Sequence, residues 1–310
     1  MEIFGDDNSA HLDFNAYDVG ITELAFIVEN RQLQAAAWNE LKKQGANIEI
    51  FCPMQCTSIE WNKTQANIHL SDGESLQTAL VIGADGVNSW VRNKAEIEVS
   101  QHSYQQSAMV ANFNSDLSHQ NIARQWFRRD GILALLPLPD KSISMVWSAN
   151  KDQANHLSNL SEKDLCRQVE EASNNTLGKL QLITSPVSFP LHSVHVKSLV
   201  KPRLALIGDA AHGIHPLAGQ GVNLGLRDVR KLVTTIIDRG GQADCGDYML
   251  LRQYERARKE DILTMELTTD SLQKLFNSKN LTISRLRNLG LIITNQLPLL
   301  KKRLMQNALN

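Results

Sequence analysis

The stretch LALIGDAAHGIHPLAGQGVNLGLRD, residues 204–228, decides how the chain is interpreted. Residues 204–207 have the composition of a buried strand, and a helix is expected to begin near Val222. The loop between them offers many backbone N–H groups and few long side chains. Because N–H groups at a helix N-terminus carry partial positive charge, they favour an anion or an electron-rich carbonyl. The stretch therefore predicts a flat, polar, partly negative ligand held mainly by main chain.

Three other interpretations of this stretch are less favoured. Residues 219–225 have the glycine spacing G-x-G-x-x-x-G and follow a loop, whereas a dinucleotide fingerprint has a shorter last interval and follows a strand. His212 and His215 could be metal ligands, but no acid or cysteine nearby completes a ligand set. A purely structural loop would not need so many special residues.

A second motif is TALVIGADGVNSWVR, residues 78–92. An apolar strand runs into a turn that contains Gly83 and Gly86, and a helix begins near Ser89. The carboxyl end of a strand is where α/β sheets bind ligands, and glycines permit close backbone approach. Asp85 could accept hydrogen bonds from a ligand hydroxyl, and it could equally cap the helix that follows. The residues alone leave both readings open.

Composition restricts the class of protein. The chain has 310 residues, 42% of them hydrophobic, and a formal net charge of −1, so we expect one large or two ordinary domains and no nucleic-acid partner. Its four cysteines are interpreted as free thiols, since only Cys52 and Cys56 lie close and no second pair completes a zinc set. The acidic N-terminus has no apolar signal region, and no run reaches ~18 apolar residues.

Hydrophobic periodicity predicts interleaved helices and strands. Helices are expected over residues 31–43 and 161–182, and almost continuously from residue 222, with breaks near 240–241, 277–280 and 298. Strands are expected over residues 47–52, three times within 56–86, and in a hairpin that turns at 139–142. This order favours an α/β domain assembled from separated segments, with a β-sheet domain inserted between them.

The two motifs resemble the DG and GD motifs of class A flavoprotein aromatic hydroxylases. The stretch RNLGLIITNQLPLLKKRL, residues 287–304, is similar to the ubiquinone-biosynthesis branch of that family. The resemblance covers nearly the whole chain. It implies an α/β fold with an FAD-binding, three-layer Rossmann-like domain, an inserted β-sheet substrate domain and a helical C-terminus. Residues 1–99 and 200–310 would form the FAD-binding domain, and residues 100–199, with part of 1–20, the substrate domain.

The resemblance also implies a function. The chain would be an FAD-dependent monooxygenase that hydroxylates a polyprenylated phenol in ubiquinone biosynthesis, using NAD(P)H and O₂. The cofactor supplies the oxygen chemistry, while the protein positions it and excludes water. Expected partners are the phenol and proteins of a ubiquinone-biosynthesis complex, in the cytoplasm or peripheral to the inner membrane. The apolar C-terminal helices fit such a membrane contact, but they fit a packed core better.

The resemblance assigns contacts with the cofactor residue by residue. Asp209 would hold the ribityl chain, Asp85 would lie beside the cofactor phosphates and the approach of NAD(P)H, and Arg31 would reach toward FAD. The loop from Pro216 and the helix start would face the pyrimidine edge of the flavin and stabilise its negative charge after reduction. The expected cofactor-binding residues are Arg31, Asp85, Gly208, Asp209, Pro216, Gly219, Gln220, Gly221, Val222 and Asn223. No side chain is assigned as a catalytic base, and no metal is expected.

One part of the family pattern is missing. Class A hydroxylases open with a strand, G-x-G-x-x-G and a helix, and this sequence has no such segment. We therefore expect a chain shortened at its N-terminus, with apolar sheet edges exposed. The alternative function is a non-catalytic remnant or assembly partner in the same pathway without stable FAD binding. A related reductase or halogenase is less favoured, because no distinctive halogenase tryptophan motif is present.

Overall fold

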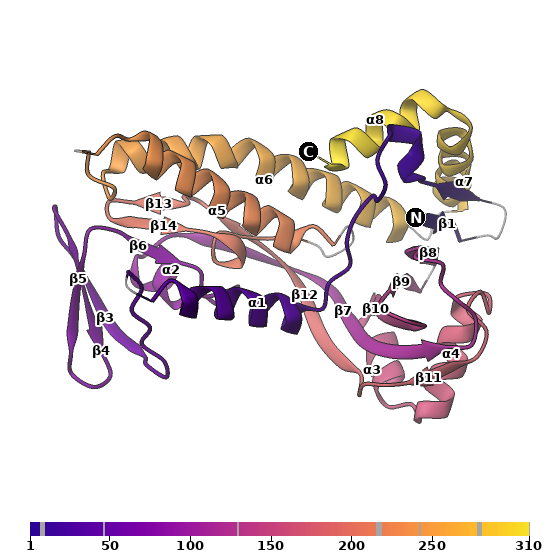
Figure 1. Ribbon diagram of the computed structural model, residues 1–310. Helices are drawn as coiled ribbons and strands as arrows, with labels where there is room; N and C mark the ends of the chain where they lie inside the picture. Colours follow the sequence, from indigo (N-terminus) through magenta and orange to yellow (C-terminus); the bar gives the residue numbers. More distant parts are fainter. Residues whose placement is uncertain are drawn as a thin grey trace. The chain divides into compact units, whose positions relative to one another are not determined.

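The computed structural model describes residues 1–6, 10–45, 47–128, 130–214, 219–241, 243–277 and 281–309, and the chain forms two compact units (Figure 1). Unit 1 comprises Met1–Ala46, Gln105–Leu191 and Leu272–Asn310, and unit 2 comprises Asn47–Tyr104 and His192–Ser271. The middle part of unit 1 lies within the predicted substrate domain. Residues 1–20, part of which the prediction assigned to the substrate domain, belong to the same unit as this middle part, and so do residues 21–46 and 272–310, which the prediction assigned to the FAD-binding domain.

Unit 1 is built on a mainly antiparallel sheet in which consecutive neighbours are β7, β10, β9, β8, β1 and β2. The bounds of these strands are β1 Glu2–Phe4, β2 His11–Asp13, β7 Val99–Ser115, β8 Arg124–Arg128, β9 Gly131–Pro137 and β10 Ser142–Asn150. The predicted hairpin is confirmed by the pairing of β9 with β10. Alternate side chains of the two strands, among them Leu133, Met145 and Trp147, are fully buried in one core.

Two helices and a short strand follow this hairpin. They are α3 Lys151–Ser158, α4 Glu162–Ala172 and β11 Leu180–Leu182. The prediction of one helix over residues 161–182 is therefore right only for its first half. Asn174, Asn175 and Gly178 have positive φ angles of 55°, 54° and 69°, a conformation that asparagine and glycine tolerate and a continuing helix excludes.

The remaining elements of unit 1 come from the two ends of the chain. They are the 3₁₀ turn η1 Ala16–Val19, α1 Asn30–Lys43, which confirms the predicted helix, α7 Leu281–Gln296 and α8 Pro298–Leu309. Helix α7 contacts β2, and α8 contacts η1. The prediction that the apolar residues of these C-terminal helices form core is wrong for Leu289, Ile293, Leu299, Leu300 and Leu304, which are exposed, Leu299 to 86%.

Unit 2 contains a small sheet in the order β13 Val200–Lys201, β14 Leu204–Leu206 and β6 Val81–Gly83. Strand β14 is completely buried and pairs in parallel with β6. Helix α5 Gly221–Asp238 and the first part of α6 Tyr248–Asn277 lie side by side along this sheet (Figure 1). The end of β12 Val187–Val196 pairs with β15 His212–Gly213. The predicted helix start at residue 222 is confirmed to within one residue.

A three-stranded antiparallel sheet completes unit 2. Its strands are β3 Cys56–Trp61, β4 Ala66–Leu70 and β5 Ser75–Thr78. Residues 56–86 thus hold four strands, because β6 joins the other sheet. The prediction of a strand over residues 47–52 is wrong, because no strand in the described part of the chain pairs with this segment. Without a neighbouring strand, a segment cannot form the interstrand hydrogen bonds that define a sheet.

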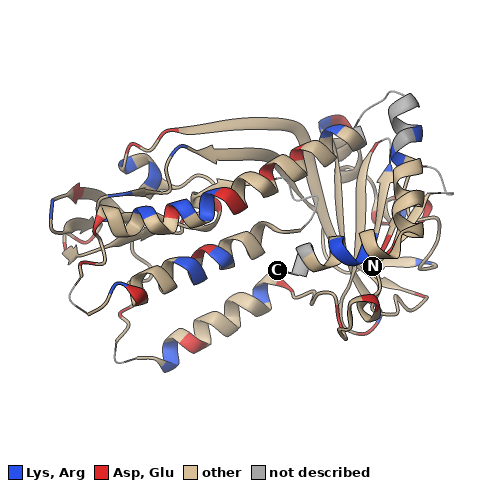
Figure 2. Ribbon diagram, turned by 90° about the horizontal axis from the view of Figure 1, so that it is seen from above, with Lys and Arg blue, Asp and Glu red and all other residues tan. Residues whose placement is uncertain are grey.

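Unit 2 also exposes apolar side chains on helix α5 and on strand β6. Five residues at helical spacing form the outward stripe of α5, namely Val222, Leu226, Val229, Val233 and Ile237. Among the described strands β6 pairs only with β14, so it lies at an edge of the small sheet, and its Ile82 is 46% exposed. Charged residues of both signs are interspersed along the helices (Figure 2). Of the helices described, none is both long and apolar enough to cross a bilayer.

We predict that Glu170→Ala lowers the stability of unit 1 by about 1–3 kcal/mol, because Glu170 is buried and its Oε1 accepts the N–H of Leu180 at 2.9 Å. Urea unfolding followed by circular dichroism measures this loss. Burial alone would raise the pKa of Glu170, but hydrogen bonds from Leu180 and Lys179 outweigh it and lower that pKa. The contribution is therefore present at neutral pH and disappears as the pH falls below about 4.3.

The matched control is Glu171→Ala, which removes the adjacent, exposed carboxylate. Equal unfolding midpoints for the two variants, or a Glu170 effect that grows as the pH falls, would contradict the assignment.

Candidate functional site

The two sequence motifs meet at one edge of the small sheet of unit 2. In the parallel register Leu206 of β14 lies opposite Gly83 of β6, and the N–H of Ile207 donates to the Gly83 carbonyl at 3.0 Å. Both strands end here, so the turn after Gly83 and the turn after Ile207 leave the sheet side by side. This is the edge at which parallel α/β sheets bind ligands.

Asp85 caps the short helix α2 Trp90–Lys94. Its Oδ1 accepts from Ser89 Oγ at 2.5 Å, and its Oδ2 accepts from the N–H of Val91 at 3.0 Å. Burial alone would raise the pKa of Asp85, but these hydrogen bonds outweigh it and hold that pKa below its ordinary value. The capping interpretation thus accounts for its present contacts, and the carboxylate is ionised at neutral pH.

Arg92 connects the two turns, a role that sequence reasoning missed. The side chain is buried, and its Nη1 donates to the carbonyl of Ala210 at 2.9 Å, while Nη2 donates to the carbonyl of Val87 at 2.8 Å. One planar guanidinium therefore fixes the spacing of two loops that lie more than a hundred residues apart in the sequence.

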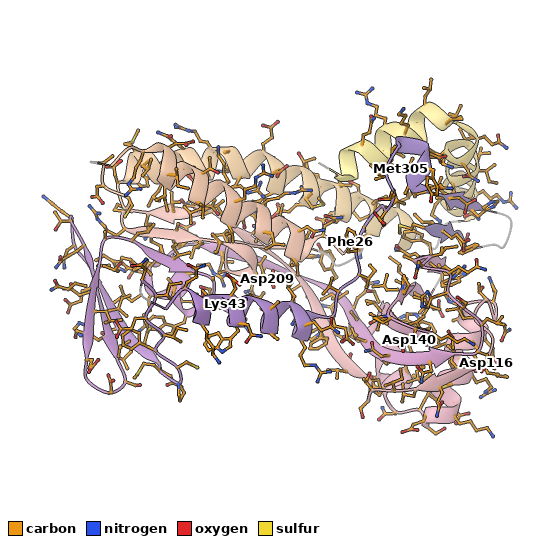
Figure 3. All side chains as sticks on the ribbon, viewed as in Figure 1. Phe26, Lys43, Asp116, Asp140, Asp209 and Met305 are labelled. Atoms are coloured by element: carbon orange, nitrogen blue, oxygen red, sulfur yellow. The ribbon has the colours of Figure 1, made fainter. Side chains whose placement is uncertain are left out.

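The turn after β14 is the 3₁₀ segment η2 Gly208–Ala210. Gly208 has a φ of +59°, and its N–H donates to Asp228 Oδ2 at 2.9 Å. A Cβ on Gly225 of α5 would lie 3.2 Å from Gly208 Cα, so a glycine there permits the close approach of helix and turn. Asp209, labelled in Figure 3, occupies an exposed position, and within the described residues its carboxylate has no hydrogen-bond or ion-pair partner.

The N-terminus of α5 is also open. Gln220 occupies the N-cap position but makes no side-chain cap hydrogen bond; its Oε1 instead accepts from Asn223 Nδ2 at 3.1 Å. Within the described residues, therefore, no side chain caps the first N–H groups of the helix, including those of Gly221 and Val222. His215 and Pro216 lie outside the described residues.

These features fit an FAD group. Among the described residues, nothing lies within 4 Å of a Cβ placed on Gly208, Gly219 or Gly221, so this part of the backbone leaves room for a flat ligand. An exposed carboxylate at Asp209 can accept hydrogen bonds from hydroxyls, and an uncapped helix N-terminus attracts negative charge. Arg31 lies on α1 in unit 1, and its predicted contact with FAD stays a prediction.

A buried charged cluster lies behind the turn, and the sequence did not reveal it. His212, one of the two histidines weighed as metal ligands, has its Nε2 2.6 Å from Asp228 Oδ2, and Arg258 Nε donates to Asp228 Oδ1 at 2.7 Å. The available signal was the position of Asp228, one turn from Leu224 and one turn from Leu232 on the buried face of α5. A carboxylate on the buried, otherwise apolar face of a helix is unfavourable unless hydrogen-bond donors are buried beside it, so its position predicts such donors.

Comparison with known proteins gives consistent results. The model of an FAD-binding-domain family matches residues 33–266. The chain is 33% identical over 302 residues to 3-demethoxyubiquinol 3-hydroxylase of Escherichia coli strain K12. This alignment covers 97% of this chain and 77% of that protein. It is 34% identical over 288 residues to ubiquinone hydroxylase UbiL of Rhodospirillum rubrum, covering 92% of this chain and 67% of that protein.

Solved structures show the same fold. The chain matches p-nitrophenol 4-monooxygenase PnpA from Pseudomonas putida with a TM-score of 0.79 at 16% identity, over 99% of this chain and 80% of that one. It matches PqsL from Pseudomonas aeruginosa with a TM-score of 0.77 at 20% identity, over 94% of this chain and 80% of that one. The chain belongs to the class A FAD-dependent aromatic hydroxylases, in the branch of the ubiquinone-biosynthesis monooxygenases.

Proposed function

We propose that the chain hydroxylates the aromatic ring of a polyprenylated phenol in ubiquinone biosynthesis, with NAD(P)H as reductant and O₂ as oxidant. The observation that carries this proposal is the similarity over 97% of the chain to an enzyme named for hydroxylation in this pathway. The open pair of turns in unit 2 supports it, because it provides a backbone-rich surface for a flat, polar cofactor.

The cofactor-binding roles follow from this surface. Asp209 accepts hydrogen bonds from the ribityl hydroxyls, since its exposed carboxylate has no other use in the described turn. Asp85 lies near the cofactor phosphates and the approach of NAD(P)H; its carboxylate oxygens retain lone pairs beyond those that bind Ser89 and Val91. Gly208, Gly219 and Gln220 border the surface, and Pro216 and Arg31 complete the proposed set.

The start of α5 has an electrostatic role. The N–H groups of Gly221, Val222 and Asn223 lie at a helix end that no described side chain caps, and they stabilise negative charge on the pyrimidine edge of a reduced flavin. Bound FAD itself supplies electron uptake from NAD(P)H and activation of O₂. The protein contributes orientation of the cofactor and exclusion of water from it.

A substrate with a polyprenyl tail partitions into a bilayer, so we propose that the enzyme works on the cytoplasmic side, in peripheral contact with the inner membrane and with other proteins of the pathway. The exposed leucines of α8, Leu299 above all, support this proposal, since exposed apolar side chains on a helix that also carries Lys301 and Lys302 suit an interfacial contact.

We predict that Asp209→Ala weakens FAD binding by about tenfold or more, because hydrogen bonds between a charged acceptor and ligand hydroxyls are lost. Titration of flavin fluorescence against the purified full chain gives the dissociation constant. Asp238→Ala, which removes an exposed carboxylate at the far end of α5, is the matched control and should leave it unchanged. An unaltered constant for Asp209→Ala would remove the assigned role.

We further predict that the FAD-loaded chain converts a short-chain prenylated phenol into its ring-hydroxylated product when NAD(P)H and O₂ are supplied. With isotopically labelled O₂, mass spectrometry should find one labelled oxygen atom in the product. Consumption of NAD(P)H that yields hydrogen peroxide without ring hydroxylation, or a product labelled from water, would contradict the proposed reaction.

A further inference from the structure

Asp228 is a buried carboxylate to which the proposed reaction gives no task. It is 0% exposed and lies on the face of α5 that otherwise buries Leu224, Leu232 and Thr235. An ionised group in such surroundings is unfavourable unless several donors surround it. Its contacts therefore indicate what the carboxylate is for.

Three donors from three different segments converge on this carboxylate. Oδ2 accepts from the N–H of Gly208 at 2.9 Å and lies 2.6 Å from His212 Nε2, and Oδ1 accepts from Arg258 Nε at 2.7 Å. Burial alone would raise the pKa of Asp228, but these hydrogen bonds outweigh it and lower that pKa. Because an ionised carboxylate only accepts, Nε2 of His212 carries the proton in this contact.

The Gly208 contact connects the cluster to the turn η2. Gly208 has a positive φ, and the next residue is Asp209, whose carboxylate is exposed. The carbonyl of Gly208 accepts the N–H of Ala211 at 2.8 Å, so the turn closes on itself directly above Asp228. With Arg92 bound to Ala210, the turn is fixed at both its first and its last residue.

We propose that Asp228, oriented by His212 and Arg258, is a positioning residue for FAD binding. Its carboxylate fixes the N–H of Gly208 and, through that peptide, the direction of the Asp209 side chain. The inference rests on the proposed role of Asp209 in holding the cofactor. His212 is then an orienting donor whose Nε2–H keeps the Asp228 carboxylate in place.

The test compares FAD dissociation constants of full-length variants in the absence of phenol and NAD(P)H, together with hydrogen exchange of a peptic fragment covering residues 204–211. Asp228→Asn should weaken FAD binding by about tenfold or more and speed up exchange in this fragment. The asparagine side chain replaces one carboxylate oxygen by an NH₂ group, which cannot accept a hydrogen bond from the donors that face it. Glu255→Gln is the matched control. It changes a buried carboxylate of the same unit that binds Ser198 and Leu199, and it should alter FAD affinity less than about threefold.

A second pair of variants keeps the test decisive if Asp228→Asn does not fold. His212→Gln retains an N–H in the position of Nε2 and should bind FAD with wild-type affinity. His212→Leu has no such N–H and should weaken FAD binding as much as Asp228→Asn does. Equal affinities for His212→Gln and His212→Leu would overturn the proposal, as would equal losses in Asp228→Asn and Glu255→Gln. A wild-type chain that binds FAD but does not hydroxylate phenols would contradict the proposed reaction alone, while absence of FAD binding would overturn both.

Discussion

The parallel pairing of β14 with β6 is the constraint on which the site depends. It ends two strands at one sheet edge and places the turns of two distant motifs beside each other. Neither turn is held by its own local hydrogen bonds alone. Asp85 caps α2, Arg92 on that helix reaches the carbonyl of Ala210, and Asp228 on α5 binds the N–H of Gly208. Sheet register thus brings the turns together, and buried side chains fix their geometry.

The polar groups of this edge divide into two sets. Behind the turns, the charged side chains of Asp228 and Arg258 are buried and satisfy one another. In front, the Asp209 carboxylate is exposed, and no described side chain caps the N–H groups at the start of α5. Leaving a buried polar group unpaired costs free energy. Movements that would break the hydrogen bonds of the rear set are therefore unfavourable, and the turn is held rigid. The front set keeps its hydrogen-bonding capacity, which in our proposal the cofactor uses.

Local patterns in the sequence predicted much of this architecture. The helix of residues 31–43, the hairpin that turns at 139–142 and the helix that begins beside Gly221 follow from periodicity and turn residues. Long-range contacts were not predictable in this way. The bond between Arg92 and Ala210 spans 118 positions, and no period relates them. The helix predicted over residues 161–182 ends before Asn174 and Asn175, which have positive φ angles. Paired asparagines are a turn signal, but the prediction followed the hydrophobic periodicity instead.

The central claim is that this turn pair and the α5 N-terminus hold FAD. The most direct measurement is a visible absorption spectrum of the purified chain after incubation with FAD and desalting. The account predicts retained flavin bands near ~450 nm, with about one flavin per chain, because the exposed Asp209 carboxylate and the N-terminus of α5 offer hydrogen-bonding groups to the cofactor. A colourless protein after desalting would contradict it.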